Sequence, residues 1–147
     1  MISILTRDTV LWILVISTLL TGCIVPKESR RDKRYIKKKA SAERLLTAYY
    51  TNEALAYLHL HLYADHTFSI RTTGFYSTYY YAGNWDQSKD TVQFMYRHLN
   101  HQPTCINKMI IDIPSKRVRF VGSDTNCSDR FWGKLILLKE GIFSKDS

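Results

Sequence analysis

Strict alternation of apolar and polar residues is the sequence feature that most constrains the fold. Residues 58–63 read LHLHLY, so that every second side chain is a leucine. The same period of two recurs at 67–71, 91–96 and 109–120, where a turn at 114–116 interrupts it. A period of two places alternate side chains on opposite faces of a half-buried strand. Short strands separated by turns predict a mainly β fold, a small antiparallel meander that forms a barrel or a strongly curved sheet.

The boundaries of this meander follow from turn residues. Turns are predicted at Ala64–His66, Ser88–Asp90 and Pro114–Lys116, and the run FWGKLILLKE near the C-terminus predicts a closing strand. Residues 72–81 are rich in Gly, Ser, Thr and Tyr, which indicates a connection, with a short strand starting at Gly83. For residues 41–56 two alternatives stay open, a short helix capped by Ser41 or a first strand at Leu45–Tyr50. We expect the strand, preceded by a helical turn.

The N-terminal segment carries an export pattern. Thr9–Leu20 contains no charged residue and has the length of a signal-peptide apolar region. It leads into Leu20-Thr21-Gly22-Cys23, which resembles the lipobox of bacterial lipoproteins. The resemblance implies that Met1–Gly22 is a signal peptide that is removed, and that Cys23 is lipidated by diacylglycerol and a fatty acid such as palmitate.

The resemblance also implies a cellular location. Ile24 stands where enteric lipoproteins retained at the inner membrane have aspartate, so a host with two membranes would carry the protein on the outer membrane, facing the periplasm. An alternative remains open, because Thr9–Val25 is just long enough for an uncleaved anchor and basic residues follow it. That anchor would place the rest of the chain in the cytoplasm.

The net charge of +8 is concentrated in one short segment. Lys27–Lys39 carries eight basic residues and two acids, whereas residues 40–147 are close to neutral. With almost no apolar residue, this segment predicts a solvated basic linker whose partner is the adjacent membrane surface. A nucleic-acid partner is not expected, because residues 40–147 show no patterned basic and aromatic patch. The expected organisation is therefore signal peptide 1–22, lipidated cysteine and linker 23–40, and a single β-rich domain 41–147.

Two cysteines remain once Cys23 is assigned to lipid. In an exported domain, Cys105 and Cys127 would form one disulfide. Two unrelated buried thiols are the alternative, which a cytoplasmic location would favour. The chain has no CxxC pair and no zinc-type spacing of cysteine and histidine, so no structural metal or other cofactor is expected.

A second resemblance concerns the body of the chain. The run L-x-L-x-x-D-x-T-F at Leu60–Phe68, then Gly83-Asn84-Trp85 and Asp90-Thr91-Val92, is similar to a pattern in small exported β-barrel lipoproteins. These include calycin or lipocalin-like modules and the N-terminal domain of the copper-resistance and envelope-stress lipoprotein NlpE. The resemblance implies a strand, an aspartate turn, a buried Phe68 and a Trp85 packed across the barrel floor. The chain lacks the CxxC pair of the copper-linked family, and His66 occupies a turn position that is usually glycine.

No catalytic motif is present, and the acidic residues lie at turns, so we expect no enzyme activity. His59 and His61 share one face of a strand and would be the metal ligands if the protein were a metal-binding or metal-sensing lipoprotein. His98 and His101 would join this metal site only if their loop covers the same face. The simpler interpretation of His-x-His is a solvated face.

Tyrosine is unusually frequent, with ten residues in the chain. Tyr76, Tyr79 and Tyr81 lie in the expected connection and would contact an envelope protein or a glycan; plain surface packing is the alternative. The sequence therefore predicts a membrane-anchored envelope lipoprotein that acts as a non-catalytic binding or interaction module. A periplasmic metal-binding lipoprotein and a purely structural envelope protein are the alternatives.

Overall fold

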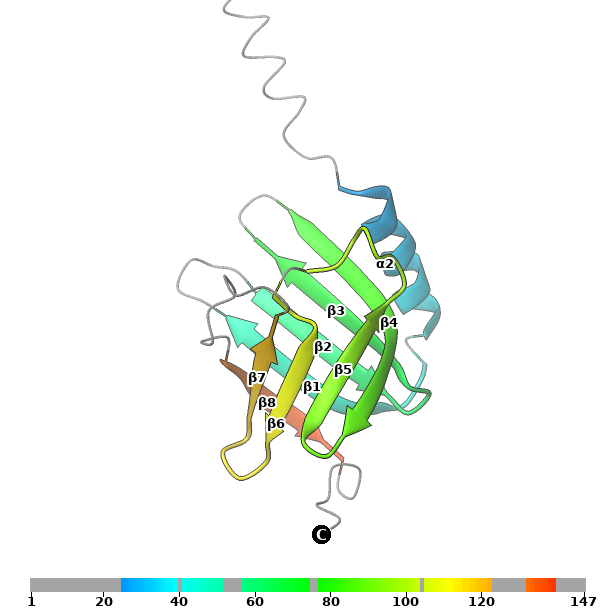
Figure 1. Ribbon diagram of the computed structural model, residues 1–147. Coiled ribbons are helices and arrows are strands. Elements are labelled where there is room, and N and C mark those ends of the chain that lie inside the picture. Colours follow the sequence, from blue (N-terminus) through cyan, green and yellow to red (C-terminus); the bar gives the residue numbers. More distant parts are fainter. Residues whose placement is uncertain are drawn as a thin grey trace, which may run out of the picture.

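Eight strands close into an antiparallel barrel in this computed structural model, which describes residues 25–39, 41–51, 57–74, 77–103, 105–122 and 132–139. Each strand pairs with its neighbours in sequence, and the last pairs with the first (Figure 1). The strands are β1 (Arg44–Thr51), β2 (Tyr57–Tyr63), β3 (Thr67–Thr73), β4 (Thr78–Ser88), β5 (Thr91–Tyr96), β6 (Lys108–Asp112), β7 (Arg117–Val121) and β8 (Trp132–Leu138). The predicted mainly β fold, a small closed meander, is confirmed.

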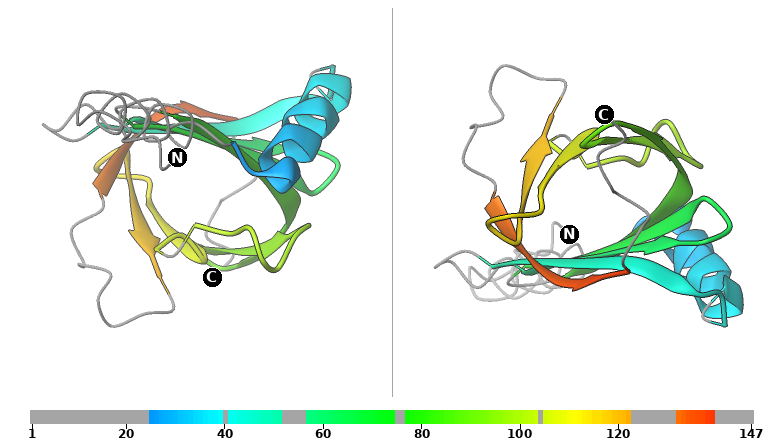
Figure 2. Two further views of the ribbon diagram at one scale, coloured as in Figure 1. Left: turned by 90° about the horizontal axis from the view of Figure 1, so that it is seen from above. Right: turned by 90° about the horizontal axis from the view of Figure 1, so that it is seen from below.

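The period of two in the sequence places alternate side chains on the inside and on the outside of the barrel. Leu58, Leu60 and Leu62 of β2 point inward and are buried, and His59 and His61 between them point outward and are half-buried. The same alternation of burial is clear in β5, β6 and β7. The interior is filled with apolar and aromatic side chains such as Phe68, Ile70, Trp85, Val92, Phe94, Met109, Val118 and Phe120. The views along the barrel show this closed ring of strands (Figure 2).

The hairpin turns confirm the aspartate-turn prediction and explain the histidine within it. Asp65 accepts hydrogen bonds from the backbone N–H and the hydroxyl of Thr67, which fixes the turn between β2 and β3. His66 has a φ of 58°, and its ring stacks on Trp85 with centroids 4.8 Å apart. This stacking compensates for the backbone cost of a left-handed conformation that glycine would adopt freely.

Two local predictions are resolved along β1 and β4. Leu45–Tyr50 lies within β1, so the strand is correct for this segment. The connection predicted at residues 72–81 is wrong, because β3 continues to Thr73 and β4 already begins at Thr78. The hydrogen-bonded pairing of these strands turns a Tyr-rich segment into regular sheet.

The basic segment forms a helix, α2 (Lys27–Lys39), instead of the expected solvated linker. The helix lies outside the ring of strands and packs against β4 (Figures 1 and 2). Its inward stripe consists of Ser29 and Asp32, both buried, followed by the half-buried Tyr35 and Ile36. These positions recur every three or four residues, as on one face of a helix. Within the described residues, no helix has the length and apolar character needed to cross a membrane.

Candidate functional site

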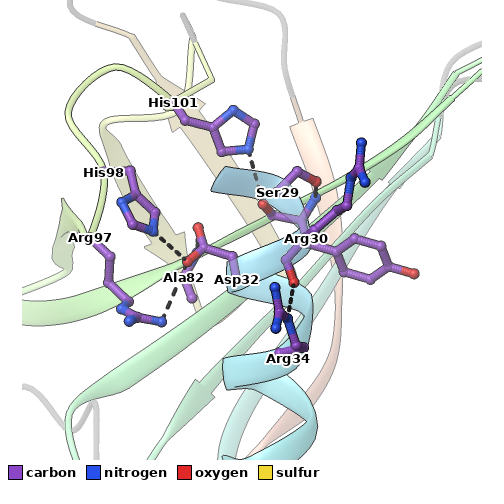
Figure 3. A network of polar contacts seen from close by, with 9 residues as sticks. Ser29, Arg30, Asp32, Arg34, Ala82, Arg97, His98 and His101 are labelled. Atoms are coloured by element: carbon purple, nitrogen blue, oxygen red, sulfur yellow. Dashed lines mark hydrogen bonds and ion pairs between the residues drawn. The ribbon is translucent and has the colours of Figure 1, made fainter. Parts of the chain in front are cut away.

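The junction between α2 and β4 is built around an unpaired stretch of sheet edge. β5 pairs with β4 only from Gly83 to Ser88, so the first half of β4 has a free edge on that side. Backbone N–H and C=O groups at such an edge need partners, because unpaired polar groups are costly when buried. Side chains of α2, together with a backbone N–H and a side chain of the loop after β5, supply them (Figure 3).

The helix provides the acceptors for this edge. The backbone N–H of Tyr80 donates to Ser29 Oγ at 2.9 Å, and that of Ala82 donates to Asp32 Oδ2 at 3.2 Å. Because both acceptors are side chains one helical turn apart, they meet two alternate residues of the strand. α2 therefore takes the place of a neighbouring strand over this part of β4.

The loop after β5 provides the donors. The backbone N–H of Arg97 donates to Ala82 O at 3.0 Å, and His101 Nε2 donates to Tyr80 O at 3.2 Å. The His101 ring also stacks on Tyr81, with centroids 4.6 Å apart. Acceptors from the helix and donors from the loop thus satisfy the same two residues of β4 from one side.

Asp32 is the charged centre of this junction and is only 1% exposed. Its Oδ1 lies 3.4 Å from His98 Nε2 and 3.5 Å from Arg97 Nη1. The buried His98 Nε2 makes no hydrogen bond to another described residue, and its interaction with the carboxylate is electrostatic. Burial raises the pKa of Asp32, whereas His98, the Ala82 N–H and Arg97 act in the opposite direction.

Replacing Asp32 should loosen the helix from the barrel. We expect Asp32→Ala to lower the free energy of unfolding by about 1–3 kcal/mol, because the Ala82 N–H loses its acceptor in a buried place. Asp32→Asn keeps an oxygen acceptor, and burial already raises the pKa of this carboxyl group, so it should cost less than alanine. Urea unfolding and the rate of tryptic cleavage within α2 are the measurements.

Glu28→Ala is the matched control for Asp32, since it removes a carboxylate from the same helix at a half-buried position. It should change the unfolding free energy by no more than about 1 kcal/mol, the size of a helix-dipole effect. If Glu28→Ala and Asp32→Ala are equally destabilised and equally susceptible to trypsin, the edge-sealing role of Asp32 is wrong.

A second surface lies on the outside of β8, β1 and β2, and we call it the outer wall. Its exposed apolar members are Ile136, Trp132 and Tyr57, with exposed fractions of 63%, 44% and 37%. Tyr49 lies between them, 4.7 Å from the His59 ring in an edge-on arrangement and 6.3 Å from Tyr57, measured between centroids. The remaining members are Thr47, Lys134 and His61. Aromatic and apolar side chains gathered on an outer face typically mark contact surfaces.

The two predicted metal ligands are part of this outer wall. His61 Nδ1 lies 3.0 Å from Thr47 Oγ1, and burial, assisted by Arg44 and His59, lowers the pKa of His61 to about 4. Burial and Arg71 also lower the pKa of His59. His98 and His101 are at the α2 junction instead. In the described part of the chain, no three His, Cys, Asp or Glu side chains gather as a metal site.

The predicted tyrosine patch has a different orientation from the one expected. Tyr81 is 9% exposed and belongs to the core, and the half-buried Tyr79 packs against that core. Of Tyr79, Tyr80 and Tyr81, the outward residue is Tyr80, whose ring lies 5.3 Å from Lys33 Nζ of the helix. The expectation that Tyr81 faces solvent is therefore wrong, because the strand phase of β4 turns it inward.

Several predicted site residues lie outside the described residues, namely Cys23, Tyr76 and Cys127. Cys105 is half-buried in the connection between β5 and β6. Lipidation of Cys23 and the pairing of Cys105 with Cys127 therefore stay predictions, as does a contact role for Tyr76.

Sequence reasoning missed Ser29 and Asp32 as structural residues and the outer wall as a surface. A signal for the first was present, since residues 29, 32, 36 and 39 recur at helical spacing within the basic segment. The outer wall had no such signal, because it includes β8, which only barrel closure brings beside β1 and β2.

In comparisons with known proteins, no family model, curated protein or solved structure matches the chain.

Proposed function

We propose that the protein is a lipid-anchored lipoprotein of the bacterial cell envelope that acts as a non-catalytic binding or interaction module. The observation that carries the proposal is Leu20-Thr21-Gly22-Cys23, placed directly after the uncharged run Thr9–Leu20. Small residues before a cysteine at this distance from an apolar run are typical of lipoprotein precursors. Ile24 supports the outer membrane, facing the periplasm, in a host with two membranes.

The short distance between Cys23 and the folded domain supports a tethering role. Only residues 24–26 separate this cysteine from the first residue of α2, and α2 is hydrogen-bonded to the barrel. A lipid on Cys23 would therefore hold the barrel close to the membrane surface. Several acyl chains, at about 0.8 kcal/mol per buried CH₂, give far firmer anchoring than one chain.

The packing of the barrel supports contact through its outside. The described interior positions are filled with large side chains such as Phe68, Phe94 and Phe120, so the interior works as a core. The outer wall presents Trp132, Ile136 and Tyr57 to solvent. Rigid aromatic side chains suit contact with a protein or with the face of a sugar ring, and an envelope protein or a glycan is the proposed partner.

The anchoring is tested by Cys23→Ser expressed as the full chain in bacteria supplied with labelled palmitate. We expect the variant to lose the label and to accumulate as uncleaved precursor, because serine provides no thiol for the lipid. Cys105→Ser is the matched control and should retain the label per molecule of protein. Equal labelling of Cys23→Ser and wild type would show that the chain is not a lipoprotein of this type.

A further inference from the structure

The outward face of α2 is made of basic residues alone. All seven helix positions that are exposed carry lysine or arginine: Lys27, Arg30, Arg31, Lys33, Arg34, Lys37 and Lys38. The two acids of the helix lie elsewhere, with Asp32 buried in the junction and Glu28 half-buried. We call these seven residues the cationic face.

The seven side chains form one continuous surface. At about 100° per residue they occupy an arc of about 160°, and thirteen residues extend over about 20 Å of helix axis. Within the described residues, none of the seven forms an ion pair with a carboxylate; the pairs of α2 are Lys39–Asp65 and those of Asp32 with Arg97 and His98. Their charge is therefore available to a partner.

The cationic face is held in a fixed position relative to the barrel. Ser29 and Asp32 bind the edge of β4 near the start of the helix, and Lys39 pairs with Asp65 of the β2–β3 turn at its end. Because both ends of α2 are attached, the seven charges form a rigid array. A rigid array loses less conformational entropy on binding than a flexible tail.

We propose that the cationic face binds the phosphate groups of anionic phospholipids, so that α2 lies along the membrane and holds the barrel in one orientation. The inference rests on the proposed function, because an anchor at Cys23 would keep this face beside the lipid. Three of the seven residues are arginines, whose planar guanidinium groups match phosphate oxygens in a two-pronged arrangement.

The aromatic residues beside the cationic face favour a lipid over a nucleic acid. Binding of single-stranded nucleic acid uses aromatic rings on which bases stack. Here the Tyr35 ring is covered by the Arg97 guanidinium at 4.0 Å, and Lys33 lies over Tyr80. The exposed Trp132 and Tyr57 are on β8 and β2, whereas α2 packs against β4. A cationic face that can bind phosphate groups but, among the described residues, offers no free ring for base stacking suits the headgroups of a phospholipid membrane.

The test is lysine footprinting of the full chain reconstituted into vesicles. One set of vesicles contains phosphatidylcholine alone, and the other contains phosphatidylcholine mixed with phosphatidylglycerol. We expect Lys27, Lys33, Lys37 and Lys38 to react several-fold more slowly with an amine reagent in the anionic vesicles. The protection should disappear in about 1 M salt, where the screening length is about 3 Å. Lys116 and Lys134, exposed on the barrel, should react equally in both and serve as internal references.

A triple variant of the three arginines, Arg30→Gln with Arg31→Gln and Arg34→Gln, provides the second measurement. Each basic group near an anionic surface contributes about fivefold to binding, so removing three should weaken the association of the cationic face with anionic lipid by about 100-fold. The several-fold protection of the α2 lysines should then be lost. The matched control removes the same charge from the barrel through Lys89→Gln, Lys108→Gln and Lys116→Gln, which are exposed outside the outer wall, and should retain protection at the four lysines of α2. Unfolding midpoints of both variants verify that α2 and the barrel remain folded.

Two outcomes would overturn the inference. Equal reactivity of the α2 lysines in both kinds of vesicle would show that the cationic face does not recognise anionic lipid. Protection by a short RNA or DNA oligonucleotide, without protection by anionic vesicles, would assign the face to nucleic acid. Neither outcome bears on anchoring, which palmitate labelling of Cys23→Ser measures separately.

Discussion

The Gly83→Ala variant is expected to lose at least about 3 kcal/mol of its folding free energy, and at 37 °C to accumulate unfolded protein. A methyl group at this position would collide with the backbone carbonyl oxygen of Met95 and would lie 2.8 Å from Phe68 Cε1. A backbone oxygen cannot rotate away as the end of a side chain can. The pairing of Gly83 with Phe68 on one side and Tyr96 on the other would therefore have to shift.

Gly74→Ala is the control for this experiment. Gly74 is exposed just after β3, and a methyl group added there would meet nothing within 4 Å. We expect the control to unfold within about 0.5 kcal/mol of wild type. Thermal or urea unfolding followed by tryptophan fluorescence compares the two variants, because Trp85 lies in the same strand as Gly83. A Gly83→Ala protein as stable as Gly74→Ala would mean that β4 and β5 do not approach each other at this glycine.

The barrel was predictable because its signal is local. The alternation LHLHLY at 58–63 reports which side chains of β2 face inward without any knowledge of the neighbouring strands. The same holds for Val92, Phe94 and Tyr96 in β5, all of which are buried as their spacing predicts. Turn residues such as Asp65 then fixed the order of hairpins, and hairpins in sequence order lead directly to a meander.

Helix α2 was missed because its buried stripe is polar. Apolar periodicity is the usual sign of a docked helix, and here the buried positions are Ser29 and Asp32. Their partners are backbone N–H groups of Tyr80 and Ala82, about fifty residues further along the chain. Sequence patterns do not show which backbone groups a sheet leaves unpaired, since that depends on β5 ending its pairing at Gly83. The eight basic residues of this segment are instead typical of a solvated linker.

The tyrosine run shows how a boundary error changes a functional prediction. A connection over 72–81 would leave Tyr79 and Tyr81 free to face solvent, as expected from the sequence. With β4 starting at Thr78, the same residues have a fixed phase, and Gly83 and Trp85 two and four positions later share the side of Tyr81. Among the described residues, the exposed aromatic side chains lie instead on the outer wall, at Trp132 and Tyr57.

Tyr81→Ser is therefore expected to destabilise the domain by about 3–5 kcal/mol, the range for removing a buried aromatic ring. The ring stacks on His101 and meets Tyr96 edge-on, with centroids 4.6 and 6.4 Å apart. Loss of the ring would leave a cavity beneath the loop after β5, whose Arg97 and His101 donate hydrogen bonds to the edge of β4. The docking of α2 and the stability of the barrel should therefore decrease together.

Tyr80→Ser is the neighbouring control, because Tyr80 points out of the barrel and its backbone N–H still reaches Ser29 Oγ. It loses the contact with Lys33 and should cost about 1 kcal/mol. Tyr81→Phe keeps the ring and loses only the hydrogen bond of its hydroxyl with Thr72, so it should also cost about 1 kcal/mol. Urea unfolding of the three variants gives the order directly. If Tyr80→Ser were the more destabilised protein and Tyr81→Ser unfolded like wild type, the phase of β4 would be the reverse of the one described. The tyrosines that face solvent would then be Tyr79 and Tyr81, and the contact surface would move from the outer wall to β4.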